Sequence, residues 1–150
     1  WHAAVDRIFT KFNAAMSQTL RESINEHPRK RMANLIRTYV HYVANQPALH
    51  KVIVQEVNHP SNRLNWLIET HLRPLFEVSV KNLEELQQQG IGPKGDVAIL
   101  FNMIRVSAGG LIAFAHELKD TSGIDLNAPG IIDKLADMII DVFLPLNIEQ

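Results

Sequence analysis

The sequence contains no cysteine among its 150 residues, so disulfide bonds and thiolate metal ligands are both excluded. Neither sign of charge is in excess. The formal net charge is -1, which gives no global electrostatic reason to expect a nucleic acid or an anionic membrane as partner of this chain. Hydrophobic residues make up 46% and charged residues 21%, which is the composition of a globular domain rather than of a disordered segment.

Long uninterrupted apolar runs are also missing. The most apolar stretch, GDVAILFNMIRVSAGGLIAFAHEL at 95–118, is broken by Asn102, Arg105 and Glu117, so it is not predicted to span a membrane. Residues 1–20 have no apolar core followed by a cleavage site, so no secretory leader is expected there. These features together predict a cytoplasmic protein.

The motifs of common enzyme classes do not occur either. HExxH, a Walker loop and G-x-S-x-G are all absent from the sequence. A single E-x-x-H, from Glu56 to His59, has the spacing of two di-iron ligands, but a di-iron site needs a second copy and further carboxylates. We therefore predict a non-enzymatic protein with no cofactor and no metal site, and a metal-binding bundle is the least favoured alternative.

What the sequence does contain is apolar residues at three- and four-residue steps along most of its length, which is typical of helices. Polar, proline- or glycine-containing turns separate these segments. We predict an all-α fold, a single-domain bundle of about six helices over 1–150 with no strand. The expected helices lie near 1–24, 28–45, 47–57, 61–89, 96–119 and 131–144.

Local features refine these helices. Asp96 and either Ser61 or Asn62 are expected to be N-caps, because short polar side chains accept hydrogen bonds from the first turn of a helix. Pro74 falls inside the helix predicted over 61–89, where its missing backbone donor predicts a kink or a local break. The basic residues of the second helix, Arg31 included, are expected to face solvent.

The helices predicted over 96–119 and 131–144 are apolar around most of their circumference, whereas a surface helix normally has one apolar face. One face can pack on the rest of the chain, and the second requires a partner. At roughly 25 cal/mol per Å² of buried apolar surface, an interface of about 800 Å² per chain would hold a homodimer. The alternative is a central helix covered on all sides by its own chain. The expected interface residues are Ile99, Met103, Val106, Gly110, Ile112, Phe114, Leu135, Ile139, Val142 and Phe143.

Polar residues inside apolar stripes are candidates for a ligand pocket, which combines an apolar lining with a few placed polar groups. His71 is either a hydrogen-bonded core histidine or a ligand contact, and Glu56 is either half of a buried ion pair or a ligand contact. Arg105 either pairs with Glu56 or, with Asn102, holds an acidic ligand. The expected effector-binding residues are His71, Glu56, Tyr39, Phe12, Met16, Phe76, Phe101, Asn102 and Arg105.

Several segments in order resemble the C-terminal domain of the tetracycline-repressor-like (TetR-family) transcription regulators. They are TYVHYVANQPALHKVIVQE at 38–56, EELQQQGIG at 84–92, the long helix that follows the Gly-Asp pair at 95–96 and has a small-residue centre, and VFLPL at 142–146. The resemblance covers essentially the whole chain.

The resemblance implies an effector-binding and dimerisation domain of a bacterial regulator, most simply a repressor. In that family the last two long helices form a dimeric four-helix bundle, and a helix-turn-helix head binds operator DNA. The head is absent from this chain, whose first helix corresponds to the family's connecting helix. A small, largely apolar effector is the implied ligand. The alternative from another class is a purely structural dimerisation domain without a ligand.

Overall fold

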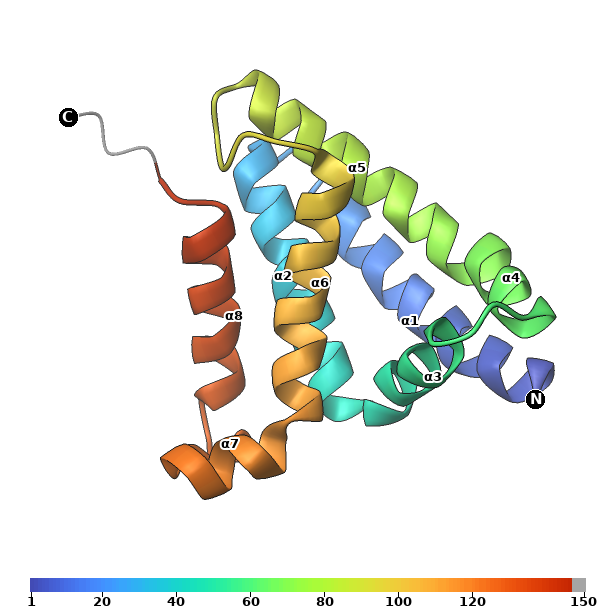
Figure 1. The fold of residues 1–150 in the computed structure, drawn as a ribbon. Coiled ribbons are helices and arrows are strands. Elements are labelled where there is room, and N and C mark those ends of the chain that lie inside the picture. The colour runs from blue at the N-terminus through green and yellow to red at the C-terminus, as the bar shows by residue number, and fades with distance from the viewer. Residues whose placement is uncertain (147–150) are drawn as a thin grey trace.

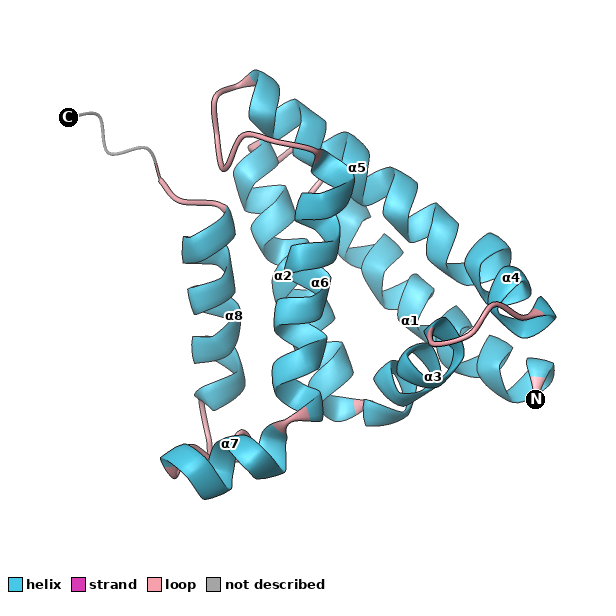
Figure 2. Cartoon of the chain, in the orientation of Figure 1, coloured by secondary structure: helices cyan, strands magenta, loops and turns pink. Residues whose placement is uncertain are grey.

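The computed structural model describes residues 1–146, and these form an all-α fold (Figure 1). Figure 2 shows helices joined by loops, with no strand in this part of the chain. There are seven helices when the unbroken run α4–η1–α5 is counted as one. The elements are α1 (His2–Glu22), α2 (Pro28–Asn45), α3 (Pro47–Val57), α4 (Asn62–Leu67), η1 (Ile68–Leu72), α5 (Arg73–Gln88), α6 (Val97–Ala113), α7 (Ala115–Ser122) and α8 (Ile131–Phe143).

The all-α class is confirmed, but the helix predicted over 96–119 is in fact two helices. α6 ends at Ala113 and α7 begins at Ala115, with a bend of 69° between their axes. The Phe114 N–H still bonds to the Gly110 carbonyl at 2.9 Å, so the chain turns immediately after a complete helical turn. Gly109 and Gly110 weaken the last turns of α6, because glycine is a poor helix former.

α2 is the central helix of the bundle. It packs against α1, α3, α5, α6 and α8. Figure 1 shows α2 and α6 running side by side with α8, while α1 and α5 cross them obliquely. The interior includes side chains from each of these helices, among them Phe9, Ile36, Val40, Leu83 and Ile140, all with at most 3% of their surface exposed.

Arg31 on α2 forms hydrogen bonds to the turn that precedes its own helix. This corrects the expectation that it faces solvent. Its guanidinium donates to the backbone carbonyls of Ser23, Ile24 and Glu26 at 3.2–3.4 Å. It also bonds to the Asn82 amide oxygen and pairs with Glu85 on α5, both at 3.1 Å. One mostly buried side chain therefore satisfies free carbonyls at the end of α1 and links α2 to α5.

The local break predicted at Pro74 is a π-helical turn, η1, immediately before that residue. The Arg73 N–H bonds to the Ile68 carbonyl five residues back instead of four. Proline has no N–H and its ring crowds the carbonyl of the previous turn, so a wider turn relieves the conflict without ending the helix. α4, η1 and α5 consequently form one long arm along the bundle (Figure 1).

Both predicted N-caps are confirmed. The Asp96 carboxylate accepts hydrogen bonds from the N–H groups of Ala98 and Ile99 at 2.8 and 3.2 Å. The Ser61 hydroxyl accepts from the Leu64 N–H at 3.0 Å and thereby starts α4. These caps fix where α6 and α4 begin, and so which of their residues face the interior.

Candidate functional site

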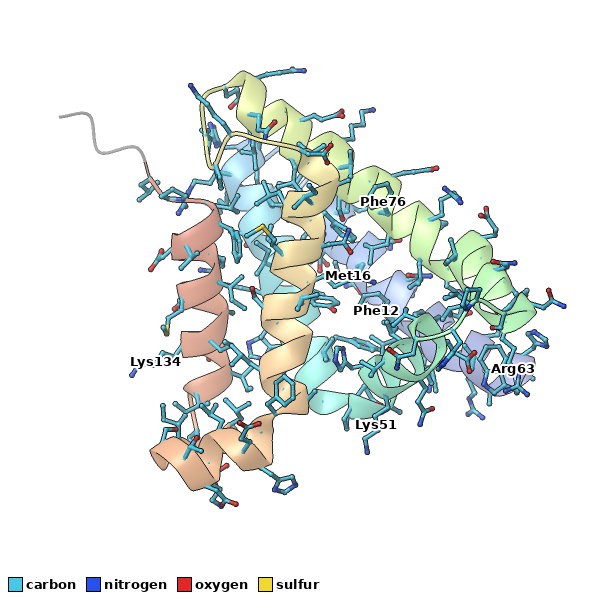
Figure 3. All side chains as sticks on the ribbon, in the orientation of Figure 1. Phe12, Met16, Lys51, Arg63, Phe76 and Lys134 are labelled. Carbon is cyan, nitrogen blue, oxygen red and sulfur yellow. The ribbon has the colours of Figure 1, made fainter. Side chains whose placement is uncertain are left out.

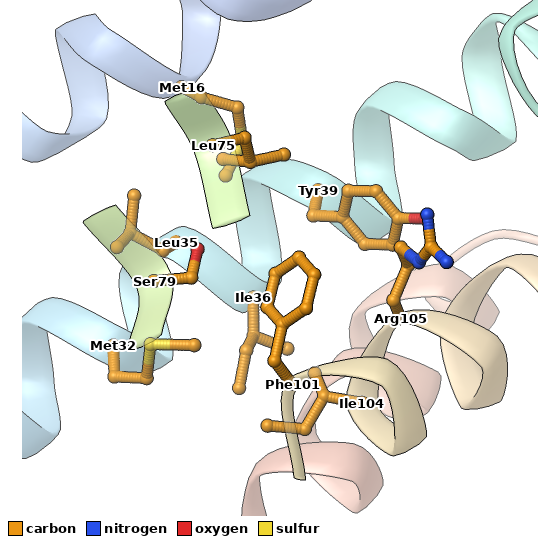
Figure 4. Close-up of a pocket in the computed structure, with 10 residues that line it drawn as sticks. All are labelled: Met16, Met32, Leu35, Ile36, Tyr39, Leu75, Ser79, Phe101, Ile104 and Arg105. Carbon is orange, nitrogen blue, oxygen red and sulfur yellow. The ribbon is translucent and has the colours of Figure 1, made fainter. Parts of the chain in front are cut away.

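Two adjoining cavities lie between α1, α2, α5 and α6, and residues of α3 and η1 also line the second. The first has a volume of about 30 Å³ and is almost entirely apolar. Figure 4 shows Phe101 projecting into its centre, with Met16 and Leu75 on one side and Ile36 on another. Its volume is close to that of one water molecule, so this part of the core is nearly full.

The second cavity is larger, about 190 Å³, and polar groups form part of its lining. Phe12, Leu72 and Phe76 belong to its apolar lining. The residues that line both cavities are Tyr39, Leu75, Phe101 and Arg105, so the two meet there. Figure 3 shows Phe12, Met16 and Phe76 directed into the bundle, in contrast to Lys51, Arg63 and Lys134, which point outward.

Arg105 is the charged residue where the cavities meet. Its Nη2 donates to the Asn102 amide oxygen at 2.9 Å, and its guanidinium carbon lies 6.0 Å from the centre of the Phe101 ring. The Asn102 nitrogen in turn donates to the Ala98 carbonyl at 2.8 Å, which holds the amide in place on α6. Figure 4 shows the Arg105 and Tyr39 side chains end to end.

The groups around Arg105 are neutral. Burial raises the pKa of Tyr39 to about 12, and the nearby charge of Arg105 opposes this only in part. Burial, followed by the same charge, lowers the pKa of His50. His50 lies over α6 where residue 109 is glycine, and a Cβ there would come within 2.5 Å of the His50 Nδ1. Gly109 therefore allows α3 to approach α6 closely beside the cavity.

Seven of the nine predicted effector-binding residues line these two cavities. They are Phe12, Met16, Tyr39, Phe76, Phe101, Asn102 and Arg105. Sequence reasoning did not select Leu72, Leu75 and Arg73, which also line the second cavity. The two leucines belonged to the predicted apolar stripe, but a stripe does not distinguish a cavity wall from filled core.

His71 lies away from both cavities. It is 4% exposed, its ring stacks on Phe9 with centroids 5.1 Å apart, and Trp66 meets it edge-on at 5.2 Å. Its Nε2 is 3.1 Å from an Asp6 carboxylate oxygen, but the pair lacks hydrogen-bond geometry, and the buried nitrogen has no hydrogen-bond partner within residues 1–146. His71 therefore packs α4–η1 against α1 rather than lining the pocket.

Glu56 is likewise outside the cavity linings. It is half-buried on α3, and the ion pairs formed within residues 1–146 do not include one between Glu56 and Arg105. Of the two alternatives for Arg105, the pair with Glu56 does not form, and Arg105 bonds instead to Asn102, three residues away on the same helix.

The predicted dimer residues divide into exposed and buried groups. Ile99, Met103, Val106, Phe114 and Val142 are exposed, Val142 by 67%, and Gly110, Ile112 and Leu135 are half-buried. The predicted interface has to be corrected at two positions, since Ile139 and Phe143 are only 5% and 8% exposed and pack in the chain's own core. Met138, which was not among the predicted interface residues, is 62% exposed.

The exposed apolar residues of α6 and α8 belong to sets with a coiled-coil spacing. On α6, exposed Ile99, Met103 and Val106 and half-buried Gly110 follow one another at steps of four, three and four residues. On α8 the same steps connect half-buried Ile131 and Leu135 with exposed Met138 and Val142. These steps place each set in a single stripe along its helix, and α6 and α8 pack side by side.

No group of three or more His, Asp or Glu side chains able to hold a metal ion occurs in the part of the chain that the structure describes. Within the same part, no individual helix has the length and apolarity to cross a membrane. Taken together, the bent pair α6 and α7 does meet that test of length and composition.

Comparisons with known proteins add no family assignment. No protein-family model matches the sequence, and no curated protein is significantly similar to it.

Proposed function

We propose that this chain is the effector-binding and dimerisation domain of a TetR-like bacterial transcription regulator, most simply a cytoplasmic repressor. The observation that carries the proposal is that α6 has an exposed apolar stripe on one side and a polar-edged cavity on the other. A regulator that acts as a dimer and responds to a small molecule needs both features. The order of sequence segments given above supports the same family.

The dimer is proposed to form through α6 and α8 of two chains, as a four-helix bundle. Large apolar side chains such as Val106 and Val142 are more than 60% exposed on these helices. Heptad spacing lets such residues interdigitate with those of a facing helix. An interface of about 800 Å² per chain would remove them from water and hold a stable dimer.

The effector is proposed to bind in the second cavity and act through α1. Phe12 of α1 lines that cavity, and Met16 of α1 lines the first. In the family that this sequence resembles, the corresponding helix connects to the DNA-binding head. A ligand that binds one position of α1 better than another would shift the spacing of the two heads, and thereby the affinity for operator DNA. The proposal includes no catalytic step and no cofactor.

Light scattering on the purified chain tests the interface. The wild type should have about twice the 17.0 kDa mass of one chain. The double substitution Val106→Asp and Val142→Asp should give a folded monomer, because it places charge in the middle of both stripes. The matched control is Val54→Asp with Val57→Asp on α3, where the valines are 44% and 46% exposed. A wild type that is monomeric at every concentration would overturn the proposal.

A second candidate is a structural dimerisation domain that binds no small molecule. The observation that favours it is the first cavity, whose volume of about 30 Å³ leaves no space for an organic ligand. The two candidates differ in ligand binding but share the dimer, so ligand titration separates them.

A further inference from the structure

The cavity face of α6 carries one positive charge that no carboxylate within residues 1–146 neutralises through an ion pair. Arg105 is half-buried where the two cavities meet. The five arginine and lysine residues that form ion pairs within residues 1–146 each face an Asp or Glu, and Arg105 is not one of them. Its protein hydrogen bond goes to the neutral Asn102 amide. A guanidinium that is partly withdrawn from water without an anion loses hydration, and a bound anion would offset that loss.

The five ion-paired side chains are Lys30, Arg31, Arg37, Arg73 and Lys119. Each of these five has a carboxylate within 3.2 Å, in contrast to Arg105.

The residues around Arg105 leave its charge uncompensated. Tyr39 keeps its proton well beyond neutral pH, because burial raises its pKa to about 12. Arg73, which also lines the second cavity, is already paired with Glu69 through its Nε at 2.9 Å. The lining at Arg105 is therefore cationic at neutral pH, and Tyr39 and Asn102 add hydrogen-bonding groups to the same lining.

The second cavity also has an apolar lining and a limited size. Phe12, Leu72 and Phe76 belong to this lining, and the volume is about 190 Å³. An apolar cavity of about 150 Å³ is known to hold one benzene molecule. The space therefore fits an apolar group of about one aromatic ring, together with a small polar head.

We infer that the second cavity binds a small organic carboxylate, in which an apolar group of about one ring lies among Phe12, Leu72 and Phe76 and the carboxylate pairs with Arg105. The inference rests on the proposed function, because it names the chemical class of the effector. A guanidinium presents a planar set of donors that matches a carboxylate, and such charge-assisted bonds are among the strongest in proteins. Because Arg105 is a single unpaired cation, the ligand that it favours carries one negative charge.

Calorimetric titration with phenylacetate and its neutral analogue phenylacetamide tests the charge requirement. The two probes have nearly the same shape, so a difference in affinity reports the carboxylate. Phenylacetate should bind the wild type roughly tenfold or more tightly than the amide, as expected for a hydrogen-bonded charge. Equal affinities, or binding by neither probe at millimolar concentration, would overturn the inference.

Variants of Arg105 test the residue itself. Arg105→Met should abolish the preference for phenylacetate, and Arg105→Lys should retain part of it, because it keeps the charge but loses the planar donor set. Arg7→Met, which removes an exposed arginine from α1, is the matched control and should leave the preference intact. Circular dichroism verifies that each variant is folded. A preference that survives Arg105→Met in folded protein would remove Arg105 from the site.

The dimer measurement separates this inference from the proposed function. A dimer that binds both probes equally would keep the regulator proposal and remove the carboxylate. A monomer that prefers phenylacetate would keep the carboxylate inference and remove the regulator proposal.

Discussion

α2 and α6 show that the more apolar of two helices is not always the more deeply buried. α2 carries four arginine or lysine residues and α6 carries one. Even so, α2 lies at the centre of the bundle and packs against five helices, whereas α6 leaves Ile99, Met103 and Val106 more than half exposed. α6 therefore has more apolar surface than its own chain covers.

The charges of α2 are compatible with its central position because they reach partners at its edges. Arg37 pairs with Asp137 at 2.9 Å and His41 contacts Asp133 at 2.6 Å, both on α8. Arg31 is bonded at the other end of the helix. The comparison therefore distinguishes apolar surface that is buried within the chain, as on α2, from apolar surface that stays exposed, as on α6.

The largest expected effect on folding comes from replacing one apolar residue of α2 and one of α6 by aspartate. Val40→Asp on α2 should abolish cooperative folding, because Val40 is 0% exposed and an unpaired buried carboxylate costs several kcal/mol. Val106→Asp on α6, at a position 62% exposed, should retain the helical content of the wild type. Circular dichroism during thermal unfolding measures both. Equal tolerance of the two substitutions would remove the distinction between the helices.

A smaller effect is expected at the start of α2. Arg31→Met should lower the free energy of unfolding by roughly 2–4 kcal/mol, because it leaves several carbonyls and Glu85 without their donor. Arg37→Met is the matched control. Its pair with Asp137 is solvent-exposed, so its loss should cost less than about 1 kcal/mol. Urea denaturation of the two variants should rank them in that order.

The smallest effect appears only in alkali and concerns Tyr39 on α2. Its pKa is about 12 in the folded chain against 10.0 ordinarily, so the folded state holds the proton more tightly. The associated stability is complete below pH 10 and is lost as the pH rises towards 12, by roughly 2–3 kcal/mol. Tyr39→Phe should flatten this part of the stability curve. Tyr42→Phe, at a more exposed tyrosine, should leave most of it in place.

Helix type and most helix limits were predictable because they depend on local signals. Asp96 and Ser61 cap helices through their own neighbours, and Pro74 disturbs its own turn. The bend at Phe114 was not predicted, since two glycines lower helix stability without specifying where the chain turns. Arg31 was also misplaced, because its partners lie on α5 and in the preceding turn.

The cavity lining was only partly predictable for a similar reason. Arg105 and Asn102 stand out as polar residues on an otherwise apolar helix, and both line the second cavity. His71 gives the same signal in the sequence, but it lies against Phe9 and Asp6. Periodicity identifies which residues share a face of a helix, whereas the neighbour opposite that face depends on the packing of the whole chain.

The two faces of α6 also restrict which substitutions this helix can accept during evolution. Phe101 and Arg105 border the cavity, while Met103 and Val106 of the same helix are more than half exposed. Substitutions along this helix must therefore satisfy two different surroundings within each turn. Among related sequences, we expect α6 to vary less than α7, whose residues are not buried.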